Sequence, residues 1–128
     1  MVRVVLTFMV LTAVSAYAQD PRGRLIGLVT DASGAVVPGA AITAIHIDMN
    51  TRFTTRSNET GYYELPYLLP GVYRVVVEME GFKRYQREPI EIRVGETVTL
   101  NVSLELGPVG ETVTVTAEAP MLESASAS

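Results

Sequence analysis

The chain has 128 residues, of which 48% are hydrophobic, a formal net charge of −4 and no cysteine. The acidic surplus excludes the basic surface with which proteins neutralise nucleic-acid phosphates, so we expect no nucleic-acid partner. Without cysteine there is no disulfide, thiol nucleophile or thiolate metal site, and a single hydrophobic core has to stabilise the domain.

The N-terminal segment has the pattern of an export signal. Arg3 precedes a largely apolar run, residues 4–18, which ends in small residues of the kind that signal peptidase accepts. At 15 residues the run is shorter than the roughly 20 that a membrane-spanning helix needs, and a short membrane anchor is the alternative. We expect a signal-peptide helix over residues 1–18, followed by a linker over residues 19–23.

Between residues 24 and 106, apolar residues recur at every second position and turn residues separate the runs, which is typical of an all-β sandwich or barrel. Seven strands are predicted, over residues 25–29, 40–47, 52–57, 62–66, 72–79, 82–92 and 97–106. In the last strand we expect alternate residues to face the core, namely Val98, Leu100, Val102, Leu104 and Leu106. Pro89 interrupts the sixth strand, and because proline cannot donate to a ladder, this strand is expected to be bulged or at an edge.

Turn residues with a clear structural purpose separate the strands. Residues 31–34 (DASG) offer an Asp side chain as an acceptor before a glycine, and residues 58–61 (NETG) read as a hairpin turn with glycine at a positive φ. Pro38-Gly39 and Pro70-Gly71 are further breakers. We expect these turns to serve the fold rather than bind a ligand.

The turn motifs in this order resemble the carboxypeptidase regulatory-like domain. The resemblance rests on residues 27–40 (GLVTDASGAVVPGA), 58–66 (NETGYYELP), 69–73 (LPGVY) and 80–82 (EGF), and it covers about residues 23–106. It implies a seven-stranded Greek-key β-sandwich, transthyretin-like or immunoglobulin-like, over residues 24–106. The superfamily also contains starch- and carbohydrate-binding modules.

The sequence predicts no enzyme activity, metal or cofactor. A zinc carboxypeptidase needs a set of His and Glu ligands, whereas this chain has a single histidine, His46, outside any H-x-x-E or H-E-x-x-H spacing. No nucleophile elbow surrounds a serine of the predicted sandwich. We therefore expect His46 to be a structural residue of its strand.

A breaker cluster at residues 107–110 marks the start of a predicted linker, residues 107–128. Within it, residues 111–117 (the box segment) alternate: Glu111, Thr112, Val113, Thr114, Val115, Thr116 and Ala117. One interpretation is an additional strand at the sandwich edge, or simply extended linker. The other is a resemblance to the TonB box of outer-membrane active transporters. In receptors of the Oar-like type, a carboxypeptidase regulatory-like domain precedes this box, and residues 117–123 are similar to the segment leading into the plug.

The second interpretation implies a partner and a location. An extended segment can add a strand to a partner sheet, and the resemblance makes that partner a TonB-like energy-transducing protein bound through residues 111–117. It also implies export to the periplasmic face of the outer membrane. The plug and membrane barrel of such receptors lie outside these residues, so a receptor fragment and a separate module are both open.

Two further functions stay open on the sequence. A carbohydrate-binding module would stack sugars on exposed aromatic rings, for which Tyr62, Tyr67 and Tyr85, with Phe82 beside them, are the candidates, although the chain has no tryptophan. A structural spacer or adhesin-like module would share the fold and bind no ligand.

Overall fold

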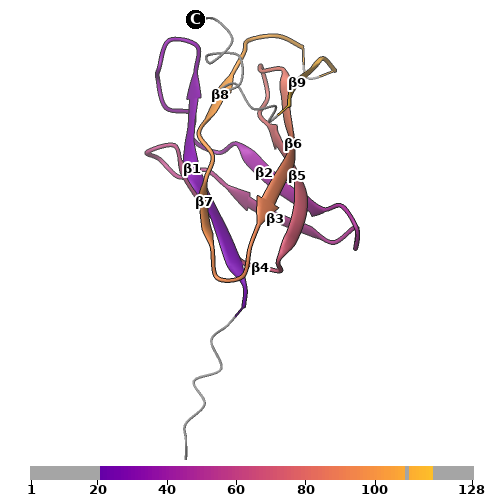
Figure 1. The fold of residues 1–128 in the computed structure, drawn as a ribbon. Coiled ribbons are helices and arrows are strands. Elements are labelled where there is room, and N and C mark those ends of the chain that lie inside the picture. Colours follow the sequence, from indigo (N-terminus) through magenta and orange to yellow (C-terminus); the bar gives the residue numbers. More distant parts are fainter. Residues whose placement is uncertain (1–20, 109, 117–128) are drawn as a thin grey trace, which may run out of the picture.

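The computed structural model describes residues 21–108 and 110–116. These residues form β-strands and connecting loops without a helix, so the all-β prediction is confirmed (Figure 1). None of the described segments is a helix long and apolar enough to cross a membrane. The predicted signal helix and the last part of the predicted linker, residues 117–128, lie outside the described residues.

Two sheets pack face to face. The strands are β1 Gly23–Asp31, β2 Ala41–His46, β3 Arg52–Arg56, β4 Tyr62–Leu68, β5 Gly71–Glu78, β6 Arg84–Ile92, β7 Thr97–Thr99, β8 Val102–Leu104 and β9 Thr112–Thr116. One sheet has four strands in the order β4-β1-β7, with β8 also paired to β1, and the other has five in the order β3-β2-β5-β6-β9. The pairs β1–β7, β1–β8 and β6–β9 are parallel, whereas the remaining pairs are antiparallel. Both sheets are therefore mixed.

The strand predicted over residues 97–106 is split into β7 and β8, because the backbone turns inward at Leu100. The Leu100 carbonyl accepts a hydrogen bond of 2.5 Å from the buried Tyr63 hydroxyl, and a Cβ atom on Gly27 would lie 1.9 Å from that same carbonyl oxygen. The Asn101 side chain replaces the missing ladder acceptor, since its Oδ1 accepts from the Leu28 N–H at 3.1 Å. Glycine at position 27 is thus what lets the carbonyl approach β1.

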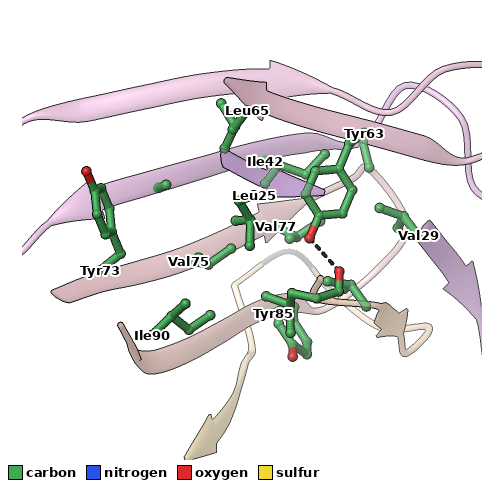
Figure 2. Packing of buried hydrophobic residues seen from close by; sticks show 14 of the residues in the cluster. Leu25, Val29, Ile42, Tyr63, Leu65, Tyr73, Val75, Val77, Tyr85 and Ile90 are labelled. Carbon is green, nitrogen blue, oxygen red and sulfur yellow. Dashed lines mark hydrogen bonds between the residues drawn. The ribbon is translucent and has the colours of Figure 1, made fainter. Parts of the chain in front are cut away.

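The core lies between the sheets and is built from alternate strand residues (Figure 2). Its largest fully buried side chains are Tyr63, Tyr73, Leu25, Ile42, Leu68, Ile92 and Leu104. As expected, Leu100, Val102 and Leu104 are buried. The prediction was wrong for Leu106, which is 76% exposed, because the ladder to β1 ends at Leu104 and Leu106 instead forms an isolated bridge with Phe82.

Strand β6 contains the bulge that Pro89 predicted. Tyr73 of β5 pairs with Ile90, and Val75 pairs with Arg87, so β6 has one residue more than β5 over this stretch. The extra residue changes which positions face the core, from Tyr85 before the bulge to Ile90 after it. The strand is not at an edge, because β9 pairs with its other side.

Two loops repeat one hydrogen-bonded turn, which confirms the structural role expected for residues 31–34. In each, the side-chain Oδ1 of the first residue, Asp31 or Asn58, accepts from the backbone N–H groups two and four positions later, at 2.8–3.0 Å. The same oxygen accepts a hydroxyl two positions later, at 2.6 Å from Ser33 and 2.7 Å from Thr60. The Ser33 hydroxyl is the main cause that lowers the pKa of Asp31. Gly61 closes the second turn with a φ of 79°, as expected.

Candidate functional site

Residues 112–116 of the box segment form the edge strand β9, which is paired in parallel with β6 (Figure 1). The ladder runs in register from Arg84 opposite Thr112 to Glu88 opposite Thr116. The valines face the sandwich, and Val115 packs against the core, while the threonines are exposed. The first interpretation allowed either an additional strand or an extended linker, and the structure has the strand, so the sheet continues beyond the predicted sandwich end at residue 106. Ala117 lies outside the described residues.

Lys83 fixes the loop that leads into β9. Its N–H donates to the Glu105 carbonyl at 2.7 Å, and its Nζ lies 3.7 Å from Glu105 Oε2 and 3.5 Å from Glu111 Oε2. A Cβ atom on Gly107 would lie 2.7 Å from the Lys83 side chain, so the loop backbone runs directly over that side chain. Both carboxylates are exposed, and exposed ion pairs of this kind contribute about 0–1 kcal/mol each. The ladder and the inward valines therefore carry most of the attachment.

On the open side of β9, the backbone groups have no partner among the residues that the structure describes. The Arg84 N–H donates to the Glu111 carbonyl at 2.8 Å, which shows that the backbone groups of Glu111 point toward β6. In such a ladder the N–H and C=O of one residue point to the same side and alternate along the strand. The backbone groups of Thr112, Thr114 and Thr116 therefore point away from β6, toward the side where no described strand lies.

Among the edges that the structure describes, β9 is the one without a feature that blocks strand addition. Strand β3 has an arginine at each end, Arg52 and Arg56. Strand β4 contains Pro66 and a register shift, and the β7–β8 edge is interrupted at Leu100. Charges, prolines and irregular backbone are the devices with which proteins protect sheet edges. Strand β9 has only threonine and valine, in an unbroken register.

The three tyrosines proposed for sugar stacking do not form a platform. The assignment of Tyr85 was wrong: its side chain is 7% exposed and lies in the core. Regular alternation from the buried Ile90 would place Tyr85 on the outer face, but the bulge at Pro89 shifts the alternation by one residue. Tyr62 is half-buried on the outer face of β4, and Tyr67 is 65% exposed. Tyr62 and Tyr67 are five positions apart on β4, or roughly 16 Å along the strand, so the two rings do not lie side by side.

A shallow polar pocket of about 380 Å³ lies beside Tyr67, and no pattern in the sequence indicated it. Tyr67 has a φ of 61°, in the left-handed region, and the Arg22 guanidinium carbon lies 5.9 Å from its ring centroid. On the same wall, Arg24 reaches Glu64 Oε1 and Thr97 Oγ1, each at 3.2 Å. The pocket thus combines one exposed ring with arginine and carboxylate groups.

His46 is a structural residue, as expected. The Met49 N–H donates to its Nδ1 at 3.1 Å, so Nε2 carries the proton and donates to the Pro70 carbonyl, also at 3.1 Å. The ring lies edge-on to Tyr73, at a centroid distance of 5.1 Å, and is 5% exposed. A Cβ atom on Gly71 would lie 2.2 Å from Nε2, so glycine makes room for the imidazole.

Comparison with known proteins places these features in a family context. The profile of the carboxypeptidase regulatory-like domain matches residues 24–105. The TonB-dependent transporter Oar of Myxococcus xanthus is 32% identical to this chain over 110 residues, which make up 85% of the chain and 10% of that transporter. The chain therefore spans about a tenth of the length of this relative.

Solved structures share the fold. The TIE protein of Bacillus anthracis matches with a TM-score of 0.54 and 26% identity, over 67% of this chain and 17% of that one. Hydroxyquinol 1,2-dioxygenase from Pseudomonas putida DLL-E4 matches with a TM-score of 0.53 and 10% identity, over 66% of this chain and 56% of that one. At such low identity the second likeness concerns the fold alone. Within residues 21–108 and 110–116, no cluster of three His, Cys, Asp or Glu side chains could hold a metal ion.

Proposed function

Because the chain belongs to the carboxypeptidase regulatory-like domain family, we propose that it is the N-terminal accessory domain of a TonB-dependent outer-membrane transporter. In this role it is exported, lies at the periplasmic face of the outer membrane and catalyses no reaction. Its task is to present the box segment, residues 111–117, to a TonB-like energy-transducing protein. The plug and barrel would belong to the part of such a transporter that this chain does not span.

The observation that carries the proposal is the position and exposure of β9. The strand follows directly on a regulatory-like sandwich, and one relative of this chain is a TonB-dependent transporter. Its open side offers the backbone groups of alternate threonines, and a partner strand would pair with them by main-chain hydrogen bonds. The side chains of this strand set the register of such a pairing.

The proposal is tested with a peptide of residues 108–120, titrated into the C-terminal domain of the cognate transducer by isothermal calorimetry. We expect weak, saturable binding. Replacing Thr112 or Thr114 by proline should abolish it, because the N–H of each threonine lies on the open side and proline removes that donor. A Thr114→Val peptide is the matched control, since valine keeps the backbone N–H and the β-branched backbone preference, and it should bind like the parent. Absence of binding by both the parent peptide and the intact chain would refute the proposal.

A carbohydrate-binding module is the alternative that one structural feature favours. Tyr67 exposes most of its ring beside a pocket with arginine and carboxylate groups, which can bind hydroxyls. A glycan array separates the two functions: no signal would remove this alternative, whereas a signal lost in the Tyr67→Ala variant would support it. A structural spacer predicts neither glycan nor transducer binding.

A further inference from the structure

We propose that residues 112–116 of the box segment bind the partner without leaving the sandwich, so that β9 becomes a central strand between β6 and a strand of the transducer. This inference rests on the proposed function and adds the state in which the segment is recognised. A free extended tail and a segment that has to detach first are the two states that it excludes.

Detachment would disrupt contacts that the structure shows on the inner side of β9. Val115 packs against the core, and the parallel ladder holds five residue pairs, from Arg84–Thr112 to Glu88–Thr116. If β9 left, the valine would be exposed and the backbone groups of β6 on that side would lose their partners, including the Arg84 N–H that now donates to Glu111. Unpaired backbone groups are strongly disfavoured unless water replaces the partner.

Binding at the open side requires none of these losses. The backbone groups of Thr112, Thr114 and Thr116 already point outward and repeat about every 6.6 Å, which is the spacing that an added strand needs. The added strand would continue an outer-face row that runs from Val76 through Gln86 to Thr114. On the inner face, an apolar side chain of the partner would cover the half-buried valines.

A docked strand also has an advantage in affinity over a free peptide. The five residues of β9 have a fixed backbone before the partner arrives, so their conformational entropy is not lost on binding. We expect the intact chain to bind the transducer domain with a Kd at least about tenfold lower than that of the 108–120 peptide. A segment that must detach predicts the reverse, because the cost of detachment weakens the intact chain.

The decisive variant locks β9 to β6 with a disulfide. Gln86 and Thr114 are register partners on the outer face, and the sequence has no cysteine of its own, so Gln86→Cys with Thr114→Cys can form one defined bridge. The full exported chain is titrated with the transducer domain in its oxidised and reduced forms. Thr43→Cys with Thr54→Cys is the matched control, because it bridges β2 and β3 on the same face, away from β9.

We expect the oxidised and reduced forms of the locked variant to bind with Kd values within about threefold of each other, as do both forms of the control. If oxidation abolishes binding in the β6–β9 variant alone while the peptide still binds, detachment is required and the inference fails, although the proposed function stands. If neither the peptide nor any intact chain binds, the proposed function itself fails.

A second variant tests the open side without a bridge. The Thr114 N–H points away from β6, so Thr114→Pro in the full chain removes a donor to the partner and leaves the β6 ladder its own donors. We expect loss of transducer binding with the Tm unchanged within about 3 °C, because a proline whose nitrogen faces the open edge removes no hydrogen bond of the β6–β9 ladder. Binding retained by a folded Thr114→Pro chain would overturn the inference.

Discussion

Replacing Tyr63 by phenylalanine removes one hydroxyl from the middle of the sandwich. The Tyr63 side chain lies in the core (Figure 2) and is 1% exposed. Its hydroxyl donates to the Leu100 carbonyl, whose oxygen lies close to Gly27. Phenylalanine keeps the ring but leaves that carbonyl without its donor inside the protein, which costs about 1–3 kcal/mol. At neutral pH we therefore expect the free energy of unfolding of Tyr63→Phe to fall by that amount, and its Tm by roughly 5–15 °C.

The same variant should reduce the sensitivity of the protein to alkali. Burial is the largest cause that raises the pKa of Tyr63; the charge of Tyr85 adds to this effect, and Arg87 opposes it. In the unfolded chain the phenol titrates near pH 10, so above that pH the unfolded state releases a proton that the folded state keeps. The stability from this group is complete below about pH 10 and falls by about 1.4 kcal/mol per pH unit above it. Burial also raises the pKa of Tyr73, so part of the alkaline loss remains in the variant.

Urea unfolding followed by circular dichroism from about pH 7 to about pH 11 measures both effects. The wild-type and Tyr63→Phe curves of unfolding free energy against pH should differ at neutral pH and converge above about pH 10. Tyr62→Phe is the control, because it removes a hydroxyl from the next residue of β4, on the outer face. Parallel curves for wild type and Tyr63→Phe, or equal stability at neutral pH, would refute the reasoning.

Two further substitutions test the packing of the sandwich by thermal and urea unfolding. Gly27→Ala places a Cβ atom 1.9 Å from the Leu100 carbonyl oxygen, so β1 and the β7–β8 segment must separate. We expect the free energy of unfolding to fall by about 3 kcal/mol or more. Near wild-type stability would contradict this contact. The Arg87 Nε is buried and has no hydrogen-bond partner among the described residues, so Arg87→Met should leave the stability unchanged or raise it by up to about 1 kcal/mol. A clear loss of stability would show that the guanidinium is better satisfied than its geometry indicates.

The sequence predicted the strands well because alternation and turn chemistry are local. Six of the seven predicted runs appear as single strands where expected and the seventh as two strands, and the acceptor oxygen of Asp31 makes the turn that its spacing indicated. Alternation in the sequence does not show at which residue a strand stops pairing, or where a bulge shifts the side chains that face the core. Leu106 continues the pattern after the ladder to β1 has ended, and one extra residue near Pro89 puts Tyr85 inside.

The candidate site was only half predictable for a related reason. The threonine and valine pattern of the box segment predicts an extended strand, but no pattern in the strand identifies its neighbour. The pairing of β9 with β6 is parallel and joins residues 28 positions apart, such as Arg84 and Thr112. The inward turn of the Leu100 carbonyl, which needs a glycine on the adjacent strand, likewise depends on a contact distant in sequence.

Lys83 offers a site for selective chemical labelling of the sandwich. It is the only lysine in the sequence, its side chain is 30% exposed, and its Nζ lies 3.5 Å from Glu111 Oε2 at the entrance to β9. An amine-reactive dye would therefore attach within the sandwich at one side chain, where the loop meets the edge strand. Acylation there removes the positive charge but alters no atom of β9 itself, so the label would report on the edge strand from a neighbouring position.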